Sequence, residues 1–472
     1  MHEHTHQNAP NGEAYRKVTD DVLRPMQSYS LGWMAGVAFC AFLILVGAIS
    51  EGYQLKYGMG MSGLMHPMMW AVYITNFVWW IGIAHSGTLI SAFLFLFRAP
   101  FRAAFSRASE AMTLFAVMTA GLFPLIHLGR PWRAYWLMPY PNERMLWINF
   151  RSALVLDVFA VTTYFIVSTL FFWLGLIPDV AVVRDRSKGW KRTIYGLLSV
   201  GWEGRGKQWR HYWMAYSVLA CLAAPLVVSV HSVVSWDFAS AIVPGWHSTI
   251  SAPYFVAGAI LSGLAMVLTL LIPLRKNLAL QEYITIDRME QIAKLTLLMS
   301  MVVGYSYLSE HFMTLYGREP SDLADLWNKV RGTWASPFWA MNFCNVIAPL
   351  ILFWRPARRN IPTLFVVSII INIGMWLERF NIIAGSLARD YNPYAWAPTF
   401  YHFRPVEVGI TLGSLGWFMF FFLLFTKFLP VLPIAELKRD ILLEHREDIA
   451  IEEAHEHPRV PGGVKPAEAT ES

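Results

Sequence analysis

Ten long apolar stretches determine what this chain can fold into. They lie at about 31–50, 67–97, 107–128, 150–175, 211–236, 252–274, 291–313, 337–354, 362–384 and 405–429. Most reach the ~20 residues with which a helix crosses the hydrocarbon layer, and the alternation typical of transmembrane β-strands is absent. Only 15% of the residues are charged, against about a quarter in globular domains. The sequence therefore predicts an all-α polytopic membrane protein with about ten transmembrane helices in a lipid bilayer.

Basic residues are more frequent in every second connection between these stretches, and the opposite connections are poorer in them. They include Arg98, Arg102, Arg107, Arg184, Arg186, Lys188, Arg275, Lys276, Arg355 and Arg358, whereas residues 237–251 contain no Lys or Arg. Short loops rich in Lys and Arg remain in the cytoplasm, so both termini are expected there. The formal charge of +6 belongs to this topology signal, and we expect no nucleic-acid partner.

Two segments repeat with an offset of four helices. His127-Leu-Gly-Arg-Pro131 resembles the run from His311 through Gly317-Arg-Glu-Pro320, and Trp147-Ile-Asn-Phe150 resembles Trp339-Ala-Met-Asn-Phe343. An even number of intervening spans gives both copies the same orientation, which predicts a parallel repeat of four-helix units. Chance similarity is the alternative. The second copy has Leu350 where the first has Asp157.

This repeat predicts six parts. They are a cytoplasmic N-terminal tail (1–30), a first flanking helix with its outer loop (31–66), a first four-helix bundle (67–250), a second four-helix bundle (251–404), a last flanking helix (405–430) and a cytoplasmic C-terminal tail (431–472).

The first candidate site joins a histidine and an acid. Asp157 lies inside an apolar span, where a carboxylate is costly and therefore suggests a function; a structural hydrogen bond to a neighbouring helix is the alternative. His127 ends the preceding span, and histidine exchanges protons near neutral pH. Consecutive antiparallel helices are usually neighbours, so we expect His127 and Asp157 to form a proton-accepting pair, unless His127 is only an interfacial histidine.

Other ionisable residues are weaker candidates. Arg379 is expected to neutralise Asp237 or Asp157 across the bundle interface, or else to reach the lipid headgroups; Asp237 alone would be an ordinary helix-end acid. His85 is a candidate for a proton path, with a satisfied core histidine as the alternative. The remaining candidates, which form either a second half-channel or polar contacts between helices, are Tyr305, Glu310, His311 and Glu378.

The cysteines limit the cofactors. Cys40, Cys221 and Cys344 all lie in apolar stretches, and no C-x-x-C motif occurs. We therefore expect no iron–sulfur cluster, structural zinc or covalently attached haem in this chain.

These motifs together resemble a known family. The His127–Pro131 segment, the Trp147–Phe150 segment, Asp157 in the next span and Glu378-Arg-Phe-Asn-Ile382 are similar to those of the NrfD/polysulfide-reductase membrane subunits. Length and flanking helices most resemble the larger of the two NrfD-like subunits of alternative complex III. The resemblance covers about residues 30–430.

The resemblance implies a function. Such subunits hold no redox centre and bind a quinol, usually menaquinol, in the first bundle near the periplasmic side of the bacterial cytoplasmic (inner) membrane. Electrons pass to an iron–sulfur, molybdopterin-oxidoreductase-like periplasmic subunit and then to c-type cytochrome subunits; the set also includes a second NrfD-like membrane subunit. The matching quinol-site residues are His127 and Asp157, with Asp237 and Arg379 as supporting charges.

We therefore expect a quinol-oxidising subunit of a respiratory or photosynthetic complex that releases protons to the periplasm. Translocation of further protons is an open alternative. The rival interpretations are a haem b-binding cytochrome subunit, with axial ligands among His127, His231 and His311, a proton-coupled transporter, and a membrane anchor without a quinol site.

Overall fold

The computed structural model describes residues 12–138, 149–388 and 400–442, which excludes Trp147. In these residues the chain is helical, without β-strands, and ten helical spans are long and apolar enough to cross a membrane. They are Leu31–Tyr57 (α2), Val72–Leu96 (α3, η2 and α4), Ser106–His127 (α5), Ala153–Arg186 (α6), Gly206–Ala239 (α8), Ser251–Asn277 (α9), Ile286–Gly317 (α10), Ala335–Phe353 (α12, η5 and η6), Ile361–Gly385 (α14 and η7) and Pro405–Phe428 (α15). The prediction of an all-α polytopic fold is confirmed.

Several spans are longer than their apolar stretches. Helices α6 and α8 contain 34 residues each and α10 contains 32, so at 1.5 Å per residue they reach about 50 Å. A hydrocarbon layer is about 30 Å thick, and these helices must project beyond it. The predicted boundaries were too short here because polar residues occupy the projecting turns.

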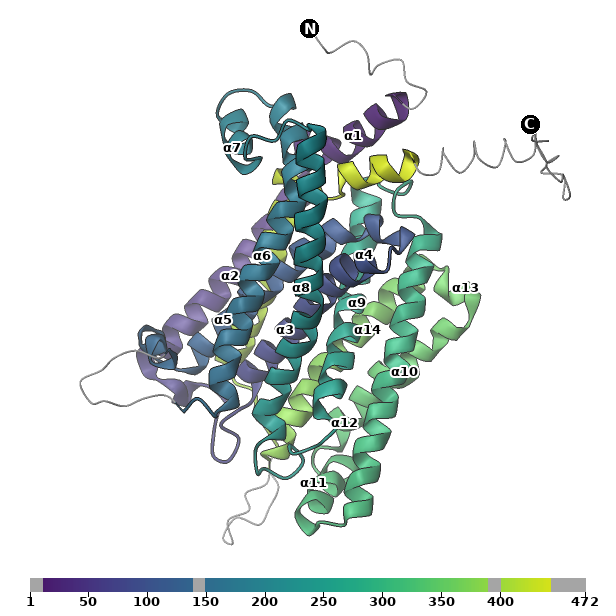
Figure 1. Ribbon diagram of the computed structural model, residues 1–472. Helices are drawn as coiled ribbons and strands as arrows, with labels where there is room; N and C mark the ends of the chain where they lie inside the picture. The colour runs from purple at the N-terminus through teal and green to yellow at the C-terminus, as the bar shows by residue number, and fades with distance from the viewer. Residues whose placement is uncertain (1–11, 139–148, 389–399, 443–472) are drawn as a thin grey trace, which may run out of the picture.

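Short helices mark the two ends of the molecule. At one end, which we call the α1 end, lie α1 (Gly12–Gln27), α7 (Trp190–Leu198) and a helical segment at 434–442. At the opposite end, the α11 end, lies α11 (Pro320–Arg331) (Figure 1). The remaining short elements are η1 (Met59–Met61), η3 (Pro100–Ala104), η4 (Pro131–Leu137) and α13 (Arg355–Arg358). Both segments predicted as terminal tails thus contain helix.

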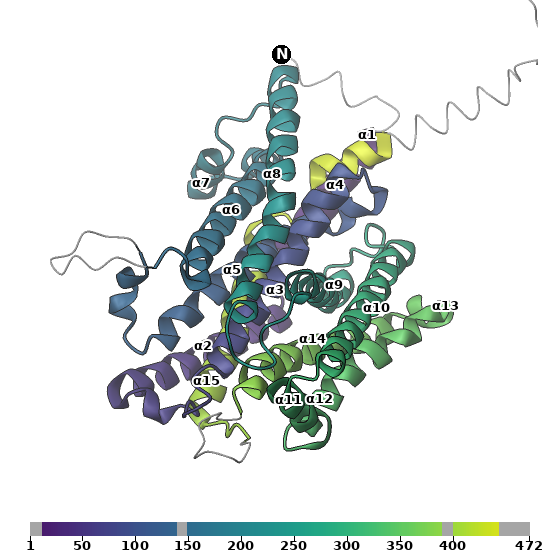
Figure 2. The same cartoon turned by 60° about the horizontal axis from the view of Figure 1, so that its bottom comes forward.

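Helix α9 occupies the centre of the molecule. It packs on α3 and α8 on one side and on α10 and α14 on the other, as the view toward the α11 end shows (Figure 2). Helices α3, α5, α6 and α8 contact one another, and α2 pairs along its length with α15 beside them. The division into two repeated bundles at 67–250 and 251–404 stays a prediction.

Glycine permits the closest helix contacts. A Cβ atom on Gly413 of α15 would lie 2.6 Å from the Cα atom of Gly47 in α2. A Cβ atom on Gly87 of α3 would lie 2.1 Å from Thr113 Oγ1 and 2.2 Å from Ser109 O of α5. Backbones can approach this closely only where no side chain intervenes, and the second contact fixes the part of α3 that carries His85.

Candidate functional site

Two acidic side chains lie close together in the halves of α6 and α8 nearer the α11 end. Asp157 lies in the second turn of α6, and Asp237 lies near the end of the antiparallel neighbour α8. Their carboxyl groups lie within hydrogen-bonding reach of each other, and one oxygen of each is buried without another partner. Two carboxyl groups so close cannot both be ionised without large repulsion. A proton shared between the two carboxyl groups would remove this repulsion.

His127 lies beside an aromatic wall that includes Phe238, the residue after Asp237. It is the last residue of α5, and its ring packs edge-on against Trp70 with centroids 6.4 Å apart. Trp70 also contacts Phe238, which follows Asp237, and Trp246. The Nδ1 atom of His127 is buried without a hydrogen-bond partner.

The predicted His127–Asp157 pair is not in direct contact. In the described part of the chain no hydrogen bond joins the two side chains, and the partner of Asp157 is Asp237. Asp157 is also shallower than expected, because α6 begins at Ala153. The structure thus shows an acid–acid pair at this position, and the joint role of His127 and Asp157 as proton acceptors stays a prediction.

A second polar cluster lies deeper between α3, α6 and α8. The His85 ring stacks on Tyr164 at 4.7 Å and meets the His231 ring edge-on at 4.7 Å. His85 Nδ1 lies 2.5 Å from Ile81 O, while its Nε2 and both ring nitrogens of His231 are buried without partners. Histidine can donate or accept at either nitrogen, so this cluster has unused capacity for protons or water. The two rings touch, which leaves no room for a haem between them.

Tyr164 ties this cluster to α3 and α5. Its hydroxyl donates to Ala84 O at 2.9 Å and lies 2.8 Å from Thr88 Oγ1. Thr113 of α5 donates to the same carbonyl at 2.8 Å. These hydroxyls continue the polar row from the histidines toward the α1 end.

Arg379 does not reach the acid pair. Its guanidinium forms an ion pair with Glu378 at 2.7 Å and lies 4.3 Å from the ring centroid of Phe255. Both charged side chains are buried, so each depends on the other for compensation. The expected neutralisation of Asp157 or Asp237 by Arg379 is replaced by this contact between sequence neighbours.

Tyr307, rather than Tyr305, belongs to the buried cluster around Glu378. Tyr307 donates to the Glu378 carboxylate, and Asn345 donates to the Tyr307 hydroxyl at 2.9 Å. Tyr305 is 68% exposed and points away from this cluster. A tyrosine can relay a proton only through its hydrogen-bond partners, so Tyr307 is the better placed of the two.

The last two candidates occupy separate environments on α10. Glu310 lines a cavity at the α11 end, with Lys329 and Glu378 as its charged neighbours. The His311 ring packs on Phe338 at 5.4 Å, and its Nε2 atom is buried without a partner. Neither residue contacts the Asp157–Asp237 pair through any interaction in the described residues.

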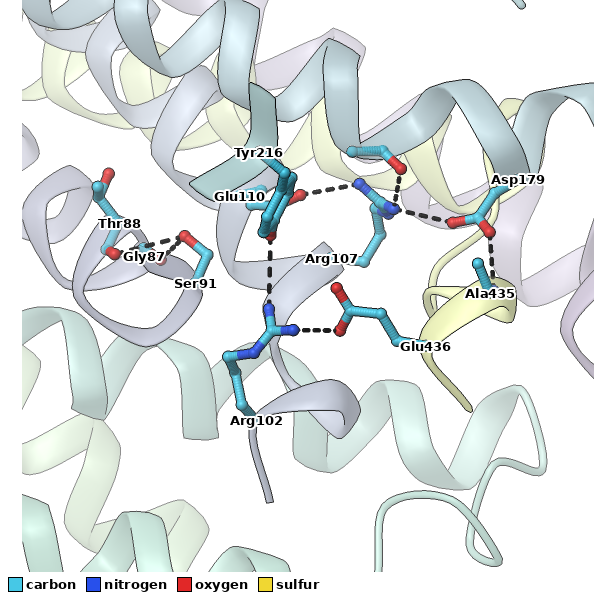
Figure 3. Close-up of polar contacts among 11 residues, drawn as sticks. Gly87, Thr88, Ser91, Arg102, Arg107, Glu110, Asp179, Tyr216, Ala435 and Glu436 are labelled. Atoms are coloured by element: carbon cyan, nitrogen blue, oxygen red, sulfur yellow. Dashed lines mark hydrogen bonds and ion pairs between the residues drawn. The ribbon is translucent and has the colours of Figure 1, made fainter. Parts of the chain in front are cut away.

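Buried charges at the α1 end form a network that the sequence did not predict (Figure 3). Arg107 pairs with Glu110 and with Asp179, each at 2.8 Å, and Arg102 pairs with Glu436 at 2.6 Å. Tyr216 connects the two arginines, because its hydroxyl donates to Glu110 at 3.0 Å and accepts from Arg102 at 3.4 Å. The backbone N–H of Ala435 donates to Asp179 at 3.1 Å.

Sequence signals for these unpredicted residues are present but weak. Glu110 is an acid in an apolar helix, which is a signal of the same kind as that of Asp157. Asp179 follows the predicted end of its span, and Arg102 and Arg107 were interpreted only as topology charges. His231 and Tyr164 carry no sequence signal beyond their presence in apolar helices.

No metal site is formed within residues 12–138, 149–388 and 400–442, where no three His, Cys, Asp or Glu side chains converge suitably. The three cysteines are unpaired, and Cys40 is buried.

The sequence matches a defined class of membrane subunit. The family model described as polysulphide reductase, NrfD, matches residues 60–389. The chain belongs to this family.

Two relatives are similar over long stretches. A putative membrane subunit of dimethyl sulfoxide reductase from Halobacterium salinarum is 27% identical over 425 residues, which cover 84% of this chain and 90% of the relative. A subunit of selenate reductase from Mesobacillus selenatarsenatis is 24% identical over 241 residues, which cover 49% of this chain and 54% of the relative.

Proposed function

We propose that this chain is the quinol-oxidising membrane subunit of an electron-transfer complex of the alternative complex III type, with menaquinol as substrate. The observation that carries the proposal is the buried Asp157–Asp237 pair, in which each acid has one oxygen without a partner. The relatives named as reductase subunits support the coarser part of the proposal, a membrane subunit of an oxidoreductase complex.

The site has the capacity that the reaction requires. Oxidation of a quinol releases two electrons and two protons. The acid pair holds one proton and can take a second, and the free Nδ1 of His127 can take another. The aromatic wall of Trp70 and Phe238 would bound the quinol ring. Both electrons would pass to an iron–sulfur cluster in a molybdopterin-oxidoreductase-like subunit docked at the α11 end.

The orientation follows from the basic connections. Connections richer in Lys and Arg, such as that between α6 and α8, lie at the α1 end, so under the positive-inside rule we propose that this end and both termini are cytoplasmic. The acid pair then faces the periplasm of the bacterial inner membrane, and its protons leave on that side. The proposed set of partners also includes c-type cytochrome subunits and a second NrfD-like subunit.

Proton movement beyond the site is a weaker part of the proposal. His85 with His231 and Tyr164 offers an inward row of proton carriers, whereas Glu378, Glu310 and His311 offer one along the second bundle. In this second row Tyr307 takes the role first given to Tyr305.

Substitution of the pair tests the proposal. Asp157→Asn and Asp237→Asn keep the shape of the side chains and allow a hydrogen bond between them, but each removes proton capacity. Loss of a positioned proton acceptor typically costs about 10²–10⁴-fold in rate. We expect this loss in quinol-dependent reduction by the purified complex, together with a large loss for His127→Ala.

The exposed acid Asp185, which pairs with Arg184 at the α1 end, supplies the control. Asp185→Asn should retain normal turnover, and all variants should assemble with their partners. Near-normal turnover in Asp157→Asn and Asp237→Asn would refute the proposed site.

The names of the relatives favour a second candidate, the membrane subunit of a terminal reductase of the dimethyl sulfoxide or selenate type. The quinol chemistry at Asp157 would be the same, but the partner would differ. Purification of the native complex distinguishes the two, because multihaem c-type cytochromes would indicate alternative complex III and a catalytic molybdenum subunit without them would indicate a reductase.

A further inference from the structure

A groove separate from the acid pair lies between α8 and α10, with α9 as its floor. At the α11 end it widens to a cavity of about 1080 Å³, lined among others by His247, Ser248, Tyr305, Leu308, Glu310 and Asp322. Toward the middle of the span it continues as a hollow of about 450 Å³ between Val228 of α8, Ile260 of α9 and Met299 of α10. Pro253 lines both spaces, so they adjoin.

The two parts of the groove differ in chemistry. The inner hollow is lined almost entirely by apolar side chains. The wide end offers the Glu310 carboxyl group and the hydroxyls of Ser248 and Ser309. Glu310 forms no side-chain hydrogen bond with any described residue, whereas Asp322 accepts from Gly245 N at 3.2 Å and faces His247 Nε2 at 3.3 Å. Glu310 is therefore the group available to a ligand.

The charge of the lining selects the ligand. No Lys or Arg is among the described residues that line the wide end, while Glu310 and Asp322 are. A phospholipid phosphate would meet two acids, and the cation near Glu310, Lys329, is already paired with Asp325 at 2.7 Å, which is unfavourable for an anion. A neutral ring with hydroxyl or carbonyl oxygens can hydrogen-bond to a carboxyl group and to serine hydroxyls. The exposed aromatic rings of Tyr305 and Phe312 suit such a headgroup, and the apolar hollow suits an isoprenoid tail.

We propose that this groove binds a second isoprenoid quinone, with its headgroup at Glu310 and its tail over α9. The inference rests on the proposed function only in that both place the chain in a quinone-containing membrane. An aromatic wall divides the two sites, because Phe238 packs against both Trp70, which touches His127, and Trp246. On the groove side Glu310 adjoins Tyr254, which hydrogen-bonds to Glu378. The headgroup at Glu310 would therefore lie next to the buried cluster around Glu378.

Photolabelling of the purified complex in lipid nanodiscs tests the inference. The probe is an azido-substituted quinone with an isoprenoid tail, and peptide mass spectrometry locates the adducts. We expect adducts at residues 248–256 and 305–314, in addition to those that the proposed function predicts around His127 and Asp157. Excess unlabelled quinone should compete at both places.

Leu308 and Leu222 provide a matched pair of variants. Leu308 lines the groove and is 72% exposed, whereas Leu222 of α8 is 51% exposed and lines none of the cavities described above. Leu308→Trp should reduce groove labelling several-fold and leave labelling around Asp157 unchanged, and Leu222→Trp should change neither. Retained labelling at Asp157 also reports that the variant is folded.

Adducts confined to the first site would overturn the inference and leave the proposed function intact. The inference would also be overturned if a phospholipid, but not quinone, displaced the groove label. It would equally be overturned if a helix of a partner subunit covered the groove and no adducts formed there. Conversely, groove labelling that persists while Asp157→Asn retains full turnover would support this inference and refute the proposed quinol-oxidising site.

Discussion

Replacement of Arg107 by methionine should destabilise the protein strongly. The guanidinium pairs with Glu110 and Asp179, each at 2.8 Å, and donates to Gly175 O at 2.6 Å. Methionine fills similar volume but leaves two buried acids without their cation. Removing one partner of a buried ion pair costs about 3–5 kcal/mol in free energy of unfolding. The acids keep one hydrogen bond each, from Tyr216 and from the Ala435 N–H, so we expect a cost within this range rather than above it.

Thermal unfolding in detergent measures this effect. A loss of this size should lower the melting temperature by on the order of 5 °C. The matched control is Lys17→Met, because Lys17 and Glu282 form a pair at 2.6 Å in which both side chains are more than half exposed. Exposed ion pairs contribute little, so this control should melt at the temperature of the unmodified protein.

A double variant tests the assigned cause. Asp179→Asn removes one uncompensated charge, so Arg107→Met with Asp179→Asn should be more stable than Arg107→Met alone. The reasoning would be refuted if Arg107→Met melted like Lys17→Met, or if Asp179→Asn lowered stability further in the double variant.

Three further outcomes follow from described contacts. Gly413→Val should separate α15 from Gly47 of α2, because its Cβ atom would lie 2.6 Å from the glycine Cα atom, and loss of α2–α15 crosslinking between introduced cysteines would report it. Tyr307→Phe should lower the free energy of unfolding by about 1–3 kcal/mol, since the buried Glu378 carboxylate loses a donor. The Tyr305→Phe variant, changed at an exposed position, should have the melting temperature of the unmodified protein. Glu436→Gln should free the segment at 434–442 from Arg102, and faster trypsin cleavage at that segment would show it; unchanged cleavage would contradict the role of the ion pair.

The transmembrane architecture could be predicted because bilayer thickness imposes a length and a composition on each helix. The ends of the helices could not be predicted, since the turns of α6, α8 and α10 that project from the hydrocarbon layer resemble polar loops in sequence. The helix at residues 12–27 was missed for a similar reason. Its buried face of Val18, Val22 and Leu23 is short, and it is stable only against the rest of the protein.

The candidate site could be predicted in part. Asp157 was identified because an acid in an apolar helix is conspicuous, but its partner depends on how α6 and α8 are rotated about their axes. That rotation brings Asp237 to Asp157 and leaves His127 beside Trp70. Arg379 was assigned to the acid pair because distance across a bundle cannot be read from sequence, whereas in the structure Glu378 satisfies it locally.

The charges at the α1 end show a limit of topology reasoning. Arg102 and Arg107 were interpreted as basic loop residues, which predicted a consistent orientation. In the structure both are buried and balanced by Glu110, one turn after Arg107 on α5, and by Asp179 and Glu436 from distant segments. The same residues thus act both as a topology signal and as part of the buried core. The first role can be read from the sequence, whereas the second can be recognised only from the folded structure.

The contact between the C-terminal segment and α6 has a consequence for biosynthesis. Asp179 and Arg102 are made before α8–α15, but the Ala435 N–H and the Glu436 carboxylate that complete their environment are made only after α15. During insertion of the intervening helices both side chains lack these partners. Synthesis of the segment at 434–442 therefore completes this end of the bundle. A chain truncated before residue 435 would contain all ten described spans, yet Arg102 would lack its ion-pair partner and Asp179 its backbone donor.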